Sequence, residues 1–368
     1  AVLQNALPAM AAMLMVLIYN LADTFFIGQT HDDLQVAAVS LATPVFLLFM
    51  SVGTVFGIGG TSVISRALGE GRKEYAKKVC SFCMWCCVGV GILMSALFLV
   101  FMDQILALIG ASAETWDYAK TYLTIVSCSG PFVLIANCYS NIIRAEGQSG
   151  KAMMGQVIGN LLNVILDPIM ILVFGWDIAG AAIATVIGNV VGAGYYIVYF
   201  LKGSSSLSIR LKDFCVKEKV ASGVLAIGIP AALGNLLMSL SSIIMNSQMA
   251  KYGDMAVAGV GVAMKVTMMT GMVCIGLGQG VQPLLGYCVG AKNWERYRSA
   301  LKFSLIFAFS LSTVLTLICY LFTGQIVSVF LTDAAAYDYG VSFAHILLCT
   351  SFLFGVFYVL TNALQARG

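Results

Sequence analysis

The chain has 368 residues, of which 60% are hydrophobic and 10% are charged, and its formal net charge is +3. This composition is typical of an all-α polytopic membrane protein embedded in the lipid bilayer. The small excess of basic residues follows the membrane topology described below, which argues against a nucleic-acid partner.

Long apolar runs separated by short polar connectors predict ten membrane-spanning helices. Each run exceeds the about 20 residues that a helix needs to cross the hydrocarbon core. The runs cover residues 2–28, 36–65, 78–102, 116–143, 152–174, 178–201, 220–250, 256–288, 297–323 and 337–364. No cleavable signal pattern precedes the first run, so we expect it to be a mature helix, with further residues ahead of it in the full protein.

The distribution of Lys and Arg predicts the orientation of these helices. Of the 20 basic residues, Lys120 and Lys251 lie in connectors after odd-numbered spans, and Lys265 lies within a span. The other 17, Arg144 among them, are assigned to connectors after even-numbered spans. Because basic residues near span ends stay in the cytoplasm, we expect a multi-pass protein of the cytoplasmic (inner) membrane with a cytoplasmic N-terminus.

An internal repeat organises the chain. A shift of 221 residues aligns GIGGTSVISRALGEGRKE at 57–74 with GQGVQPLLGYCVGAKNWE at 278–295, and WDYAKTYL at 116–123 with YDYGVSFA at 337–344. The first copy contains six spans, an even number, so the second copy begins on the same side of the membrane. We therefore predict two six-helix bundles related by a pseudo-two-fold axis along the membrane normal.

The repeat also predicts the domain boundaries. Residues 1–202 form an N-terminal six-helix lobe, residues 203–218 a cytoplasmic linker with a short helix on the membrane surface, and residues 219–368 a C-terminal lobe. Residues 148–202, which carry the last two spans of the first copy, have no counterpart before Gly368. The second bundle is therefore expected to be truncated to four of its six helices in this chain.

A polar stripe runs along the predicted fifth span. Its members are spaced four, three and four residues apart and so share one helix face: Gln156, Asn160, Asn163 and Asp167. Pro168 follows directly and lacks the N–H that would bond the carbonyl of Val164. A polar group with free backbone acceptors is thus predicted inside an apolar span.

A second acid, Asp23, lies on the first span, and Thr185 lies on the sixth. At 1.5 Å per residue, Asp23, Asp167 and Thr185 all fall in the outer half of the membrane, at depths that allow them to converge. A carboxylate in hydrocarbon costs about 2.5–3.5 kcal/mol on insertion scales. Paired acids with amide and hydroxyl neighbours can hold a proton or a small cation; the alternative is a purely structural set of hydrogen-bonded polar residues.

The eleven cysteines do not indicate a disulfide framework, because their number is odd and most lie within spans. Cys80, Cys83 and Cys86 repeat every three residues, which raises the alternative of a metal site. A regular helix splays such thiols apart, so packing is the favoured interpretation. We expect no resident metal or cofactor, apart from a Na⁺ that would be bound in transit at the acid pair.

The sequence resembles the multidrug and toxic compound extrusion (MATE) transporter family over essentially the whole chain. The likeness rests on DTFFIG at the end of the first span, NVILDPI in the fifth, GQGVQPLLGYCVGA in the eighth and the doubled six-helix layout. It implies a transporter that exports bulky, often cationic drugs or toxic organic cations by alternating access, driven by inward flow of H⁺ or Na⁺. We expect the protein to be a monomer and not an enzyme.

Within that family the chain is similar to the DinF-like bacterial and archaeal branch. The acid-bearing motif positions of that branch match Asp23, Asn137, Asn163, Asp167 and Thr185. The resemblance therefore implies a cation-coupling site at these five residues. If the coupling ion is Na⁺, its expected ligands are Asp23, Asn163, Asp167 and Thr185. Another branch carries acids in the seventh and tenth spans, where this chain reads GNLLMSLSS and FLFGVFYVL with no acid.

The substrate surface is predicted from residues that could line the space between the lobes: Gln156, Asn160, Asn20, Met238 and Lys265. Flexible methionines suit a pocket that accepts many shapes. Lys265 either faces the lumen and tunes charge preference or extends toward the membrane surface.

Other function classes fit less well. A flippase for lipid-linked precursors of related architecture is the alternative transporter, but its cavity is expected to hold several cations for phosphate, and Lys265 is the one deep basic residue predicted. An intramembrane enzyme would need a nucleophile with a base or a metal motif such as HExxH, which the sequence lacks. A passive channel is disfavoured because the acids are confined to one half of the chain.

Overall fold

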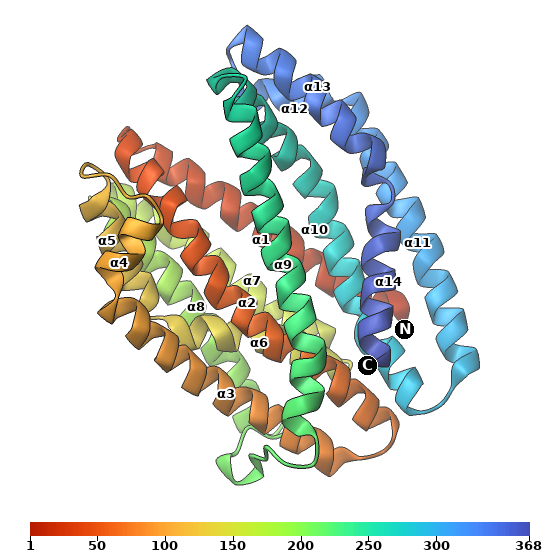
Figure 1. The fold of residues 1–368 in the computed structure, drawn as a ribbon. Helices are drawn as coiled ribbons and strands as arrows, with labels where there is room; N and C mark the ends of the chain where they lie inside the picture. The colour runs from red at the N-terminus through yellow and green to blue at the C-terminus, as the bar shows by residue number, and fades with distance from the viewer.

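The computed structural model describes residues 1–368, except for the side chain of Asp33. It is built of helices α1 to α14 (Figure 1). In the first half of the chain these are α1 Val2–Gly28, α2 Asp33–Gly69, α3 Lys73–Val100, α4 Met102–Leu108, α5 Trp116–Ser127, α6 Gly130–Ala145, α7 Ser149–Pro168 and α8 Asp177–Leu201. The second half contains α9 Val220–Ala250, α10 Asp254–Gly290, α11 Trp294–Leu321, α12 Thr323–Phe330, α13 Ala334–Ser351 and α14 Phe354–Arg367.

Eight helical segments are long and apolar enough to cross a membrane, and two helix pairs qualify only when each pair is taken as one broken span. These pairs are α5 with α6, bent by 58°, and α13 with α14, bent by 47°. Pro131 follows the first residue of α6, where its missing N–H costs nothing. Counted in this way, up to ten spans match the ten that hydrophobicity predicts.

The two halves share helix boundaries at the offset seen in the sequence. Both ends of α2 and α10 differ by 221 residues, as do both ends of α3 and α11 and the first residues of α4 and α12. The helical repeat is therefore present in the structure, whereas the symmetry axis, the domain boundaries and the truncation of the second bundle stay predictions.

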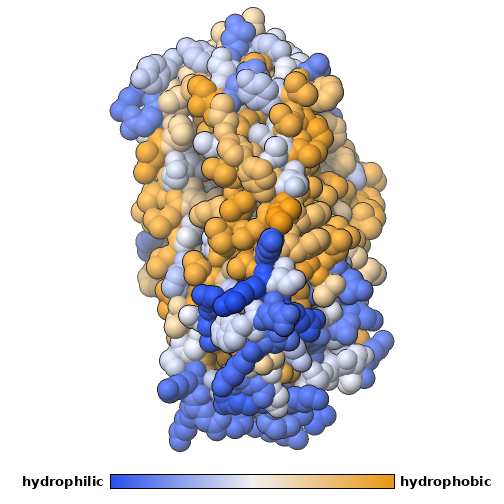
Figure 2. Space-filling view, turned by 90° about the vertical axis from the view of Figure 1, so that its right-hand side faces the viewer, coloured by the Kyte–Doolittle hydropathy of each residue, from blue (hydrophilic) through white to orange (hydrophobic). Residues whose placement is uncertain are grey.

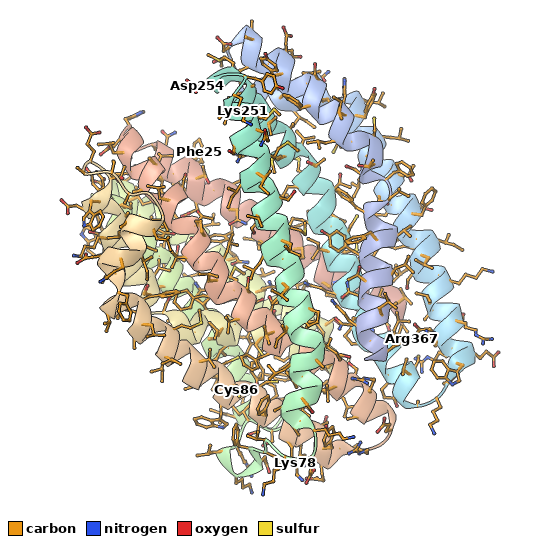
Figure 3. The ribbon with its side chains drawn as sticks, viewed as in Figure 1. Phe25, Lys78, Cys86, Lys251, Asp254 and Arg367 are labelled. Carbon is orange, nitrogen blue, oxygen red and sulfur yellow. The ribbon has the colours of Figure 1, made fainter. Side chains whose placement is uncertain are left out.

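We call α1–α8 the N-terminal lobe and α9–α14 the C-terminal lobe. We call the end where α2, α6, α8, α10 and α14 finish the basic end, since Lys78 and Arg367 lie there, while Lys251 and Asp254 lie at the opposite end (Figure 3). Hydrophobic residues cover the middle of the molecule and hydrophilic ones gather at the basic end (Figure 2). This distribution fits a protein that crosses a bilayer.

The two lobes touch through α1 and α10, α2 and α9, and α2 and α10. Glycines allow the backbones to meet there, because an added Cβ would come within 3 Å of the facing helix. Each of these contacts lies in the half of its helix nearer the basic end: Gly59 to Val224, Gly228 to Val55, Gly276 to Met10, Gly280 to Ala6, Gly69 to Tyr287 and Gly290 to Arg66. The ribbons of the two lobes diverge toward the other end (Figure 1).

The linker between the lobes is held against the N-terminal lobe. The carboxylate of Glu146, just after α6, accepts hydrogen bonds from the hydroxyls of Tyr199, Ser205 and Ser206 and from the backbone N–H of Ser206, at 2.6–3.2 Å. Trp85 of α3 donates its indole N–H to the carbonyl of Ile209. The short helix expected in the linker is one 3-10 turn, Leu211–Asp213.

The thiols of α3 are packing residues. Cys80, Cys83 and Cys87 are fully buried, and each lies within hydrogen-bond reach of a neighbouring helix: Tyr139, the carbonyl of Phe56 and the carbonyl of Leu134. These contacts account for the burial of Cys80, Cys83 and Cys87, while Cys86 is half-buried.

The assignment of Arg144 to a connector after the fourth span was wrong. This residue lies in the last turn of α6 and is only 1% exposed. The span extends to Ala145 rather than ending before the arginine, because amide side chains inside the protein satisfy the guanidinium.

Candidate coupling site

Two acids from different helices meet inside the N-terminal lobe. Asp23 lies near the end of α1 and Asp167 in the last turn of α7; they are 9% and 0% exposed. Their carboxyl groups lie within hydrogen-bond reach of each other. Because two like charges repel each other in a buried site, simultaneous ionisation of both carboxyl groups is disfavoured.

Asn163 connects Asp167 to α8. With the amide oriented to suit its neighbours, its nitrogen donates to Oδ2 of Asp167 at 3.0 Å. Its oxygen accepts from the hydroxyl and the backbone N–H of Thr185 at 3.3 and 3.2 Å. Asn163 and Thr185 are buried, and the Thr185 hydroxyl also lies 3.0 Å from the carbonyl of Ala181.

One oxygen of the acid pair remains unsatisfied. Oδ1 of Asp23 is buried and has no hydrogen-bond partner among the described residues. Carboxyl, amide and hydroxyl oxygens are the ligands that hard cations such as Na⁺ prefer, and a free carboxylate oxygen can also take up a proton.

Glycines bring α7 and α8 together below this site. A Cβ at Gly188 would lie 2.7 Å from the carbonyl oxygen of Gly159, and a Cβ at Gly159 would lie 2.8 Å from that of Gly188. Only glycine permits this approach, which resembles the small-residue contacts of other membrane helices. Asn163 follows Gly159 by one turn and Thr185 precedes Gly188 by three residues, so the contact sets the amide against the hydroxyl.

Pro168 changes the helix directly after Asp167. The regular α-helix ends at Pro168 and continues as a π-helical turn, Ile169–Val173. The wider turn follows the point at which the ring removes a backbone donor. The helix is therefore irregular just after the carboxylate, while the free carbonyl expected at Val164 stays a prediction.

The cluster also contains two tyrosines, which the sequence analysis did not single out. Tyr19 of α1 and Tyr122 of α5 both lie near Thr185 and Asp23. Tyr19 precedes Asp23 by four residues, a spacing that places both on one helix face. Tyr122 comes from a distant element, which no spacing in the sequence relates to Asp23.

The side chain of Asn137 is hydrogen-bonded to α2 and not to the acid pair. Its side-chain nitrogen donates to the carbonyl of Met50 at 2.6 Å and to the hydroxyl of Thr54 at 3.1 Å, both on α2. These bonds hold α6 against α2, and its place in the coupling site stays a prediction.

The five residues predicted to line the substrate surface do not form one cluster of contacts. Gln156 accepts a hydrogen bond from Arg144, and Asn160 is half-buried on the same face of α7. Asn20 and Met238 are exposed. Lys265 is exposed as well, with its ammonium 5.4 Å from the ring centre of Phe330. Their role in binding substrate stays a prediction.

Comparison with known proteins fits this arrangement of helices and acids. The family model described as MatE matches residues 8–169 and 230–368, two segments that correspond to the repeat. The chain belongs to the MatE family. This confirms the family resemblance seen in the sequence, and makes the chain a multi-pass membrane transporter.

Relatives in the MatE family support the assignment along the whole chain. Multidrug export protein MepA of Staphylococcus aureus (strain NCTC 8325 / PS 47) is 32% identical over 373 residues, which cover 100% of this chain and 81% of the relative. A structure described as the outward-facing conformation of a multidrug resistance MATE family transporter of the MOP superfamily is 26% identical, with a TM-score of 0.95. Another, of a MATE protein in the straight conformation, has the same identity and TM-score; each alignment covers 100% of this chain and 82% of that structure.

Proposed function

We propose that this MatE protein is a monomeric antiporter of the cell membrane that exports small drugs or toxic organic cations while H⁺ or Na⁺ moves inward. The observation that carries the proposal is the buried pair of Asp23 and Asp167, with an unpartnered oxygen and the amide of Asn163 beside it. Two ionised carboxylates buried side by side would repel each other, so the pair favours binding a proton or a cation between them.

The orientation and the conformational state are inferred from the two ends of the molecule. The basic end is assigned to the cytoplasm by the positive-inside rule. The lobes touch through the helix halves at this end, and one closely similar structure is described as outward-facing. We infer that the present structure is the outward-facing state of an alternating-access cycle, in which Asp23 and Asp167 load their ion from outside.

The multidrug substrate class rests on the relatives. The staphylococcal protein is named a multidrug exporter, and the exposed methionine and amide side chains of α1 and α9 are compatible with varied ligands. An inward-moving cation has enough energy to drive such export, because about 100 mV supplies roughly 2.3 kcal/mol per charge, equivalent to about a fiftyfold substrate gradient.

The proposal is tested in vesicles with a proton gradient and a sodium gradient imposed separately. Asp167→Asn and Asp23→Asn keep the shape of the side chain and remove its charge, so each should abolish gradient-driven efflux while leaving folding and insertion intact. Asp254→Asn, at an exposed position (Figure 3), is the matched control and should transport at the parental rate. If both buried variants still pump substrate against its gradient at that rate, the coupling site lies elsewhere.

A further inference from the structure

Arg144 is a buried cation that the coupling site does not use. It is the largest of the fully buried side chains and lies in the last turn of α6. A guanidinium always carries its charge and has five N–H donors to satisfy. Burial of such a group requires partners that compensate for lost water.

The partners of Arg144 are unusual because all of them are neutral. Nη1 donates to Oδ1 of Asn141 at 3.2 Å and to Oε1 of Gln279 at 3.3 Å, and Nη2 donates to Oε1 of Gln156 at 3.2 Å. The buried Nε has no partner among the described residues. Buried charges in proteins are usually paired with an opposite charge, whereas here three amide oxygens take that place.

One of these three partners belongs to the other lobe. Asn141 and Gln156 lie on α6 and α7, but Gln279 lies on α10. Two other hydrogen bonds cross between the lobes nearby, from the Ser62 hydroxyl to the carbonyl of Gln365 and from Arg66 to the carbonyl of Arg367. The acceptor in each of these two bonds is a backbone carbonyl. Among the three bonds between the lobes named here, only that from Arg144 to Gln279 therefore joins two side chains.

We propose that Arg144 is a reversible latch that holds the lobes together at the basic end by binding Gln279. The inference rests on the alternating-access function proposed above. When the lobes part, the guanidinium keeps its hydrogen bonds to Asn141 and Gln156 in its own lobe. It loses only the bond to Gln279, which is a neutral acceptor. A carboxylate at position 279 would instead leave two separated charges in a poorly solvated site, so the amide makes a closure that can reopen.

Two substitutions that add the same charge at similar distances distinguish this latch from a structural arginine. Gln279→Glu places a carboxylate on the C-terminal lobe and forms an ion pair across the lobes. Gln156→Glu places one within the N-terminal lobe and draws Arg144 away from Gln279. A bond between lobes stabilises the closed state, whereas a bond within one lobe competes with it.

The measurement is the labelling of Ser62→Cys by a membrane-impermeant maleimide applied at the basic end, in a chain otherwise freed of cysteine. Ser62 is 0% exposed and lies at the contact between lobes. We expect Gln279→Glu to slow labelling and transport by about tenfold, because it replaces a neutral hydrogen bond between the lobes by a stronger, charge-assisted one. Gln156→Glu is expected to speed labelling.

Gln279→Leu removes the acceptor without adding charge and should also speed labelling, so the test does not depend on the Glu variant alone. Equal changes in labelling for the two Glu variants, or no change with Gln279→Leu, would overturn the latch. Labelling does not require the coupling ion. Opposite responses of the two Glu variants would therefore support the latch even if the Asp167 test disproved coupled antiport.

Discussion

The closest approach of α7 and α8 provides a direct test of how the coupling site is held. Gly188→Ala adds a Cβ that would lie 2.7 Å from the carbonyl oxygen of Gly159 and 3.2 Å from Cβ of Asn163. Ordinary contacts of a Cβ begin at 3.4 Å. The two helices must therefore separate by about 0.7 Å, or the backbone must bend by an equivalent amount, at a cost of about 1–3 kcal/mol for overpacking.

This displacement is large relative to the hydrogen bonds above it. Asn163 accepts from Thr185 at 3.2 and 3.3 Å, and a further shift of about 0.7 Å brings both distances to about 4 Å, beyond hydrogen-bond range. Each lost bond contributes about 0.5–1.5 kcal/mol. Their combined loss should weaken ion loading by roughly tenfold or more.

The assay compares ion-driven efflux and thermal stability for Gly188→Ala and Gly194→Ala. Gly194 lies on the same helix, and a Cβ there would meet nothing within 4 Å, so its replacement should leave transport unchanged and raise helix stability by up to about 1 kcal/mol. Gly188→Ala should need a higher ion concentration for half-maximal efflux. Parental ion dependence and stability in Gly188→Ala would refute the role assigned to this contact.

Two further predictions concern single side chains. Thr185→Val removes the hydroxyl that faces Asn163 and should reduce coupled efflux, whereas Thr185→Ser keeps the hydroxyl and should retain most of it; equal activity of the two in the vesicle assay would count against the hydroxyl. Glu146→Ala deletes the acceptor of Ser205 and Ser206 and should speed tryptic cleavage of the linker at residues 210–219, since charge-assisted bonds hold that segment. An unchanged cleavage rate would show that the linker is held by its contacts with α3 alone.

Hydrophobic runs and the repeat were sufficient to predict most of the fold. The bilayer requires about 20 apolar residues per span, so helix positions follow from composition along the chain. The spacing of Asn163 and Asp167 likewise follows from helix geometry, because residues three or four apart share a face. The depth of Asp23 indicated that it could reach this face, and the structure places the two acids together.

Neighbours from other helices could not be predicted in this way. Periodicity states which residues share a face but not which helix covers it, so the approach of Tyr122 to Thr185 and the bonds of Asn137 to α2 were decided by packing. The distribution of basic residues placed Arg144 in a connector, because lysines and arginines near span ends usually lie outside the hydrocarbon core. Its burial depends on amide oxygens of Gln156 and Gln279. Tertiary structure alone brings them to one point, since they lie 12 and 135 residues away along the chain.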